Sequence, residues 1–79
     1  MHLVLAKVNE VYFDGEAHSV TVPASAGEMT VLHGHMPLIT TLKAGTIRVH
    51  LSATESEVKE FPIEKGVIEV RSDGATIIL

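Results

Sequence analysis

Two histidines near the middle of the chain, His33 and His35, stand one residue apart in the stretch GEMTVLHGHMPLITTLKAG. On a β-strand, residues at i and i+2 face the same side, so the two imidazoles could bind one divalent metal ion. Two nitrogen ligands are too few for a zinc site, which needs three or four. Gly34 and Pro37 also favour a loop here. A metal pair and loop histidines hydrogen-bonded to the backbone are therefore both open interpretations.

Other side chains that could bind a metal or take part in catalysis are scattered along the sequence. The residues that could complete a metal site are His18, His50, Glu28 and Asp14. Nothing in their spacing brings them together. No serine lies in a G-x-S-x-G elbow, and neither G-x-G-x-x-G nor a P-loop is present. The acidic group Glu10, Asp14 and Glu16 is typical of a solvated turn. We therefore predict a binding protein with no catalytic residues, no cofactor and no small-molecule substrate.

The composition narrows the class of partner. The 79 residues predict a single domain, 1–79, near the lower size limit for independent folding, and 46% of them are hydrophobic. There is no cysteine, so disulfides and thiolate zinc sites are excluded. The net charge of −4 argues against nucleic acid, which requires clustered Lys and Arg. A core this small supplies only about 3–5 kcal/mol, which is a first indication that the chain works within a complex.

The sequence gives no sign of membrane insertion. Its longest apolar run is far shorter than the roughly 20 residues of a spanning helix. The opening stretch MHLVLAKVNEVYF turns polar at Lys7 and lacks the basic leader and small-residue cleavage site of a signal peptide. We therefore predict a cytoplasmic protein.

Short β-type segments recur along the whole chain, separated by Gly, Pro and Asp. The alternation is clearest in TIRVHL, where Ile47, Val49 and Leu51 share one face. The predicted strands are 2–8, 11–13, 18–24, 28–32, 38–42, 46–51, 57–63, 67–71 and 75–79. Eight to ten short strands predict an all-β flattened sandwich or barrel, and the pattern does not choose between the two.

Turn chemistry predicts where these strands end. Asp14-Gly15 and Asp73-Gly74 are hairpin signals. Pro23 is expected to end its strand or to mark an edge, and 52–56 is expected to be a polar turn. Residues 24–27 form a loop of small residues that another backbone could approach closely. Glu28 beside this loop is a possible anchor for a partner. A plain turn is the alternative interpretation of the loop.

The stretch GEMTVLHGHMPLITTLKAGTIRV closely resembles the signature of the epsilon subunit of F-type ATP synthases, which is called delta in mitochondria. The family pattern runs roughly G-E-x-x-[VI]-x-x-G-H-x-P-L-[LI]-T-x-[LI]-x-x-G-x-[VI]-R. The residues that fit it are Gly27, Glu28, Gly34, His35, Pro37, Leu38, Thr40, Gly45 and Arg48. The flanking stretches VYFDGEAHSVTVP and FPIEKGVIEVRSDGATIIL are also similar to the family, so the resemblance covers the chain in order.

The resemblance implies a flattened sandwich of about ten strands in a non-catalytic subunit at the foot of the central stalk. There the domain links the gamma subunit to the c-ring, so that proton- or sodium-driven rotation supports ATP synthesis. The residues that match the c-ring-facing loop are Ser25, Ala26, Gly27 and Glu28. Those that match positions near the gamma contact are Lys7, His35 and Thr40, with Met36 beside them. The resemblance also implies a peripheral place on the cytoplasmic face of the bacterial inner membrane.

Two departures from the family pattern affect these expectations. His33 stands where the family usually has proline. We expect Gly34, Pro37 and Gly45 to shape the loops, His35 to face a neighbouring subunit, and His33 to have no assigned role. A small β-module that binds metal through His33 and His35 is the alternative function. The chain stops at Leu79, where typical members continue into a helical hairpin; a naturally short member and a shortened piece of a longer one are both open interpretations. In either case we expect neither the hairpin nor its inhibitory and nucleotide-binding roles in these residues.

Overall fold

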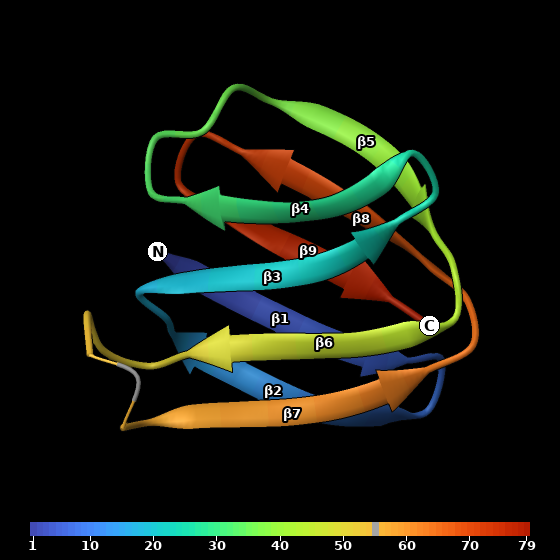
Figure 1. Cartoon of the computed structure of the whole chain (residues 1–79), viewed down its shortest axis with the longest axis horizontal. Coiled ribbons are helices and arrows are strands. Elements are labelled where there is room, and N and C mark those ends of the chain that lie inside the picture. Colours follow the sequence, from blue (N-terminus) through green and yellow to red (C-terminus); the bar gives the residue numbers. More distant parts are fainter. Residues whose placement is uncertain (55) are drawn as a thin grey trace.

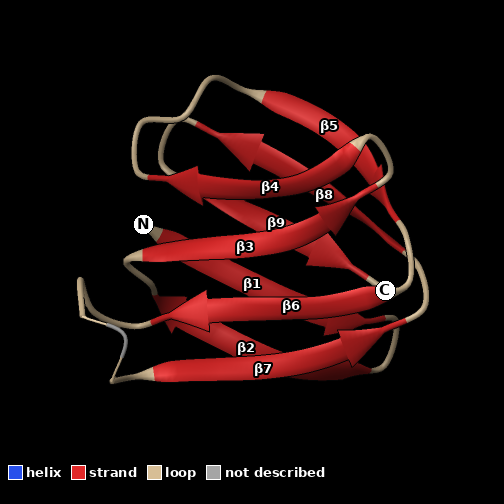
Figure 2. Ribbon diagram, viewed as in Figure 1, coloured by secondary structure: helices blue, strands red, loops and turns tan. Residues whose placement is uncertain are grey.

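The computed structural model describes residues 1–54 and 56–79, and every regular element in them is a β-strand (Figure 2). The nine strands are β1 (His2–Lys7), β2 (Glu10–Glu16), β3 (Ser19–Ala24), β4 (Gly27–Leu32), β5 (Leu38–Leu42), β6 (Gly45–His50), β7 (Val58–Ile63), β8 (Gly66–Arg71) and β9 (Gly74–Ile78). The all-β prediction is confirmed, with nine strands against the expected ten or so. The predicted polar turn 52–56 includes Glu55, which lies outside the described residues.

The strands form one sheet that folds over on itself into two layers (Figure 1). The first layer has the order β2-β1-β9-β8-β5, and the second consists of β4, β3, β6 and β7. A single pair, Ala24 with Leu42, joins the layers by pairing β3 with β5. The path ends at β2 in one layer and at β7 in the other, so the sandwich is closed on one side and open on the opposite side. Within the first layer β1 and β9 run parallel, whereas the other neighbours are antiparallel.

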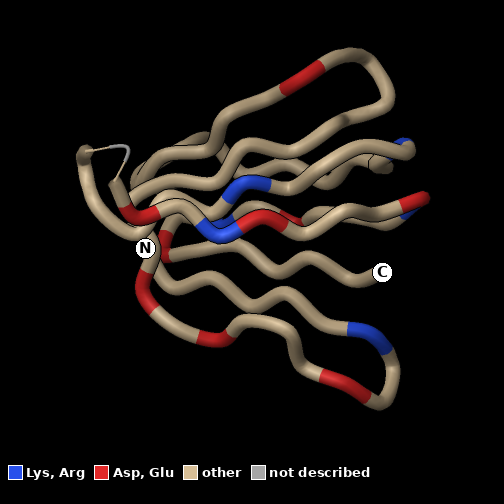
Figure 3. The backbone as a smooth tube through the Cα atoms, turned by 60° about the horizontal axis from the view of Figure 1, so that its bottom comes forward, with Lys and Arg blue, Asp and Glu red and all other residues tan. Residues whose placement is uncertain are grey.

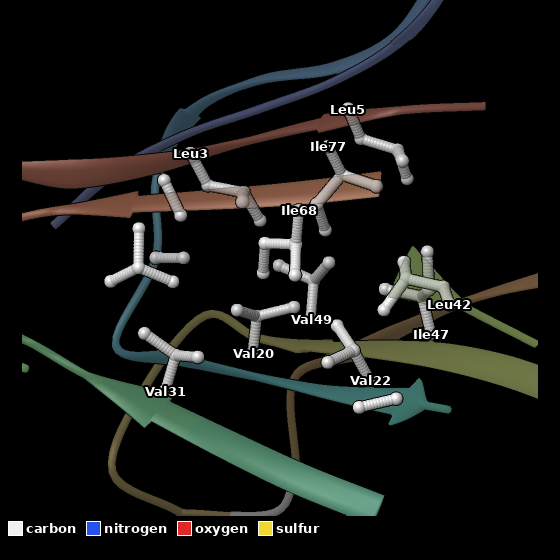
Figure 4. Close-up of a cluster of buried hydrophobic side chains, with 14 of the residues drawn as sticks. Leu3, Leu5, Val20, Val22, Val31, Leu42, Ile47, Val49, Ile68 and Ile77 are labelled. Carbon is white, nitrogen blue, oxygen red and sulfur yellow. The ribbon is translucent and has the colours of Figure 1, made fainter. Parts of the chain in front are cut away.

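Aliphatic side chains from both layers meet in the interior (Figure 4). The side chains of Leu3, Leu5, Ile68 and Ile77 come from the first layer, and those of Val20, Val22, Ile47 and Val49 come from the second; all eight are 0% exposed. The alternation predicted for 46–51 is confirmed, because Ile47 and Val49 are buried while Arg48 and His50 lie on the outer side. Since few aromatic residues are available, β-branched and leucine side chains fill the space between the pleated layers.

The outer faces of the two layers differ in polarity. On the second layer, Thr21 and Thr30 share a hydrogen bond of 2.9 Å between their hydroxyl oxygens. Ser19 and Thr21 also lie on this face, yet each is only 6% exposed, because β3 is flanked by β4 and β6, whose side chains cover it. The outer face of the first layer carries both kinds of side chain: His2, Asp14, Glu69, Arg71 and Thr76 lie on it beside aliphatic residues. We call its aliphatic part the apolar face; its residues are Val4, Ala6, Val11, Ile39, Val67 and Ile78.

The turn predicted at Asp14-Gly15 is wrong. Both residues lie inside β2, where Asp14 pairs with Val4 and Gly15 pairs with Leu3. The strand runs on to Glu16, and the chain passes to β3 through Ala17 and His18; a bulge near Tyr12 shifts the register between Leu5 and Ala6. The long β1 ladder overrides the local turn propensity of Asp-Gly. The hairpin at Asp73-Gly74 is confirmed, with Arg71 paired to Gly74 across a two-residue turn.

Pro23 does not end its strand, because β3 continues to Ala24. The ladder between β3 and β6 stops at Thr21, two residues before the proline, while the ladder with β4 continues on the other side. A proline has no N–H to donate, so it fits where one ladder has already ended. Its carbonyl oxygen accepts a hydrogen bond of 2.9 Å from the amide of Lys43.

In residues 1–54 and 56–79 there is no helix of the length and apolarity needed to cross a membrane.

Candidate partner-docking site

The loop of small residues is the tip of the β3–β4 hairpin. Ala24 pairs with Gly27, which leaves Ser25 and Ala26 as a two-residue turn. Gly27 has a φ of +140°, a backbone conformation that residues with a Cβ rarely adopt. No atom lies within 4 Å of the position where a Cβ would stand. The backbone conformation therefore requires glycine here, and crowding does not. The tip therefore presents an almost bare backbone. From here on we call residues 25–28 the docking hairpin.

The docking hairpin is attached to β5 through Ser25 and Thr41. The Ser25 amide donates to the Thr41 carbonyl oxygen at 3.0 Å. The two hydroxyl oxygens are 2.7 Å apart, and the Ser25 hydroxyl also donates to the Thr41 carbonyl oxygen at 3.1 Å. Ser25 consequently uses both its amide and its hydroxyl inside the molecule.

The other end of the hairpin is paired with β6. The guanidinium Nη2 of Arg48 lies 3.0 Å from the carboxylate Oε2 of Glu28. These residues sit on strands either side of β3, so the ion pair bridges the outer face of the second layer. Glu28 still exposes 64% of its side chain. The predicted anchor thus has an internal partner that the sequence did not indicate.

A cleft of about 410 Å³ runs between β4 and β5, which lie in different layers. It is lined by Ala24, Ala26, Gly27, Glu28, Met29, Leu38, Ile39 and Thr40. Three residues of the predicted c-ring loop and Thr40 of the predicted gamma contact therefore share one surface. Sequence reasoning missed Met29 and Ile39. The alternation of 38–42 places Ile39 and Thr40 on opposite faces of the sheet. Alternation alone does not say that the face with Ile39 is exposed.

The loop between β4 and β5 begins with a β-turn. The His35 amide donates to the Leu32 carbonyl oxygen at 3.1 Å, and Gly34 has a φ of +81°. Positive φ in the third residue only is the signature of a type II turn, which calls for glycine there. The His35 Nδ1 lies 2.8 Å from the Met36 carbonyl oxygen, which orients the ring. His33 is exposed, and Met36 is 77% exposed.

Gly34→Ala is expected to lower the free energy of unfolding by about 1–3 kcal/mol, because a Cβ strains a backbone at this φ. No neighbouring atom would clash with the new methyl group, so backbone strain is the whole effect. Thermal unfolding followed by circular dichroism measures it. A stability equal to that of the unsubstituted chain would contradict the type II turn.

The metal interpretation of the two histidines finds no support in the geometry. Among residues 1–54 and 56–79, no group of three or more His, Asp or Glu side chains could hold a metal ion. Since one nitrogen of His35 is already directed at a backbone carbonyl, the interpretation of these residues as loop histidines fits the structure better.

Gly45 serves close packing rather than a turn. It is the first residue of β6, and a Cβ there would lie 2.8 Å from the Cβ of Pro23. Pro37 is exposed and directly precedes β5. The glycine is therefore needed where β6 passes the rigid proline ring of β3.

Lys7 lies apart from the other predicted gamma-contact residues. It ends β1, which is three strands away from β5 in the first layer, or about 14 Å at the usual strand spacing. It lines a second cleft, of about 460 Å³, on the open side of the sandwich, together with Tyr12, Phe61, Pro62, Ile63, Glu64, Lys65 and Leu79. His35 and Met36 lie in the loop that leads into β5. The predicted contacts thus do not form one cluster.

Charged residues of both signs are spread over the molecule (Figure 3). Long uncharged stretches of the tube separate the charged positions. The net charge of −4 argues against binding to phosphate backbones. What remains for recognition is the bare hairpin tip with its cleft, together with the apolar face.

The chain matches the family model described as "ATP synthase, Delta/Epsilon chain, beta-sandwich domain" over residues 1–79. It is 32% identical over 78 residues to the ATP synthase epsilon chain of Herminiimonas arsenicoxydans, and 35% identical over 78 residues to that of Bordetella parapertussis. These alignments cover 99% of this chain but 55% and 54% of the relatives. The chain thus spans about half the length of the curated relatives it matches.

Two solved structures share the fold. One is a chain of the Euglena gracilis mitochondrial ATP synthase, from a structure of OSCP, F1 and c-ring, with a TM-score of 0.86 and 24% identity over 96% of this chain and 48% of that chain. The other is a chain of the Tetrahymena thermophila mitochondrial ATP synthase, from a structure of central stalk and c-ring, with a TM-score of 0.81 and 15% identity over 99% of this chain and 61% of that chain. The sandwich, the spacing of the central motif and the match over residues 1–79 agree: this chain belongs to the family of ATP synthase delta and epsilon chain β-sandwich domains.

Proposed function

We propose that this chain is a non-catalytic rotor subunit of an F-type ATP synthase, which links the gamma subunit to the c-ring so that proton- or sodium-driven rotation supports ATP synthesis. The observation that carries the proposal is the family match over residues 1–79. Support comes from the fold, which is shared with chains from central-stalk and c-ring assemblies. As such a subunit, the chain is a peripheral part of the complex on the cytoplasmic face of the bacterial inner membrane.

The apolar face is our candidate for the gamma contact. Ala6, Val11, Val67 and Ile78 lie in one row across four adjacent strands. Val11 is 62% exposed and Ile78 is 50% exposed, whereas soluble sheets usually place polar residues on such a face. An exposed aliphatic surface of this kind marks a protein interface.

The predicted gamma-contact residues are compatible with this face. Lys7 follows Ala6 on β1, and Thr40 follows Ile39 on β5, so both are next to this face in sequence but point to the other side of the sheet. His35 and Met36 lie just before β5. The docking hairpin is our candidate for the c-ring contact. It adjoins the β5 end of the apolar face, because Ile39 of that face lines the cleft beside the hairpin.

Ile78→Glu is expected to weaken binding to the gamma subunit of the same ATP synthase about tenfold or more, because it places a charge in an apolar contact. Leu32→Glu is the matched control: Leu32 is 51% exposed against 50% for Ile78, but it lies on the outer face of the other layer. Calorimetric titration of purified gamma with each variant measures the dissociation constant.

Failure of the unsubstituted chain to bind gamma at micromolar concentration would contradict the proposed function. If Leu32→Glu weakened binding as much as Ile78→Glu, gamma would dock on the opposite face, and the assignment of the apolar face would be wrong.

A further inference from the structure

The polar groups of the docking hairpin are largely used inside the molecule. Ser25 directs its amide and its hydroxyl at Thr41 of β5. Glu28 directs Oε2 at Arg48 of β6. The hairpin is thus attached to strands of both layers, β5 in the first and β6 in the second. Two contacts from different directions fix its position better than either does alone.

The groups left for a partner are mainly backbone. Ala26 has only a methyl side chain, Gly27 has none, and no atom lies within 4 Å of the position where a Cβ of Gly27 would stand. A short backbone segment of this kind recognises a partner by shape and by hydrogen bonds from its own N–H and C=O groups. Recognition of that kind depends on how firmly the segment is held, because a loop that must be ordered on binding loses affinity.

We propose that Arg48 and Thr41 are positioning residues for the docking hairpin, and that Glu28 acts on the partner through Arg48 rather than by touching the partner. The inference rests on the proposed function, in which a polar loop of the c-ring is the partner. We call the ion pair between Glu28 and Arg48 the clamp, because it holds the hairpin against β6. The surface that the ring contacts is then the backbone of Ala26 and Gly27.

A charge exchange separates this role from direct contact. Exposed ion pairs contribute little, so Glu28→Arg and Arg48→Glu are each expected to weaken binding to the purified c-ring only about threefold. The double variant, which restores the pair with its charges reversed, is expected to bind within about twofold of the unsubstituted chain. In this comparison every chain, including the reference chain without a charge exchange, carries Glu60→Gln, because position 60 pairs with position 48 and would otherwise face the new carboxylate with a like charge.

A second measurement uses the free chain and needs no ring. Hydrogen exchange of the amides of residues 25–29 is expected to be faster in Arg48→Gln and Thr41→Val, and normal in the charge-exchanged double variant. The melting temperature of each variant serves as the control, because a general loss of stability would speed exchange in β1 and β9 as well.

Four outcomes decide the question. Rescue of both ring binding and exchange in the double variant supports the clamp. A double variant that binds the ring no better than Glu28→Arg alone overturns it, and binding by the unsubstituted chain would then still uphold the proposed function. Absence of binding by the unsubstituted chain overturns the proposed function and, with it, the assignment of the hairpin to the ring. Unchanged exchange in Arg48→Gln and Thr41→Val overturns the positioning role directly.

Discussion

Ile77→Ala is expected to lower the free energy of unfolding by about 2–5 kcal/mol, because it removes a large side chain from the centre of the core and leaves a cavity. Ile77 is 0% exposed and projects from β9 toward the opposite layer (Figure 4). A domain of 79 residues has a total stability of only about 4–12 kcal/mol, so the loss is a large fraction of it. The melting temperature is expected to fall by about 10 °C or more.

The matched control for Ile77 is its neighbour on the same strand. Ile78 is 50% exposed and faces outward, so Ile78→Ala is expected to change the stability by less than about 1 kcal/mol. Urea unfolding gives the change in the free energy of unfolding for each variant. The slopes of free energy against urea concentration are compared as well. Equal losses of stability in Ile77→Ala and Ile78→Ala would contradict the placement of Ile77 in the core and of Ile78 on the apolar face.

Gly74→Ala is expected to cost about 1–3 kcal/mol, although the new side chain is a single methyl group. A Cβ at Gly74 would overlap the carbonyl oxygen of His2 and lie 3.1 Å from its carbonyl carbon. These are backbone atoms, which cannot turn aside as a flexible side chain would. The two strands would have to move apart where β1 meets β9, and β9 is the strand that connects the β1–β2 hairpin to the rest of its layer.

Gly15→Ala is the control for this substitution. Gly15 also lies in a strand of the first layer, but a Cβ there would have its nearest neighbour at 3.9 Å, an ordinary contact with the Phe13 ring. The change is expected to be neutral or to stabilise by about 0.5 kcal/mol through the unfolded state. Thermal melts of both variants provide the comparison, and similar melting temperatures would argue against close approach of β1 and β9.

Strand positions were largely predictable from local sequence. The bounds of 38–42 agree with β5, and those of 67–71 agree with β8 to within one residue. The exception is β2, predicted as 11–13 and found as Glu10–Glu16. Alternation and turn residues are local signals, and they fail where a neighbouring strand supplies hydrogen bonds that outweigh a local preference for turning.

The candidate site was predictable only in part. The bare loop at residues 24–27 follows from its composition, and the need for glycine at Gly27 and Gly34 is seen in their positive φ angles. The partner of Glu28 was not predictable. Arg48 lies 20 residues further along the chain, and only the pairing of β3 with both β4 and β6 brings the two charges to 3.0 Å.

The order of residues in this chain determined the class of structure, an all-β domain of short strands, and the family to which it belongs. Both follow from alternation, turn residues and a long motif, which are properties of neighbouring residues. The tertiary structure decided which aliphatic residues are exposed together on an outer face, and it decided that the docking hairpin is held by Thr41 and Arg48. The physical reason is that exposure and ion pairing depend on which strands become neighbours, and in this sheet the strand order departs from the chain order at β1-β9, β8-β5, β5-β3 and β3-β6.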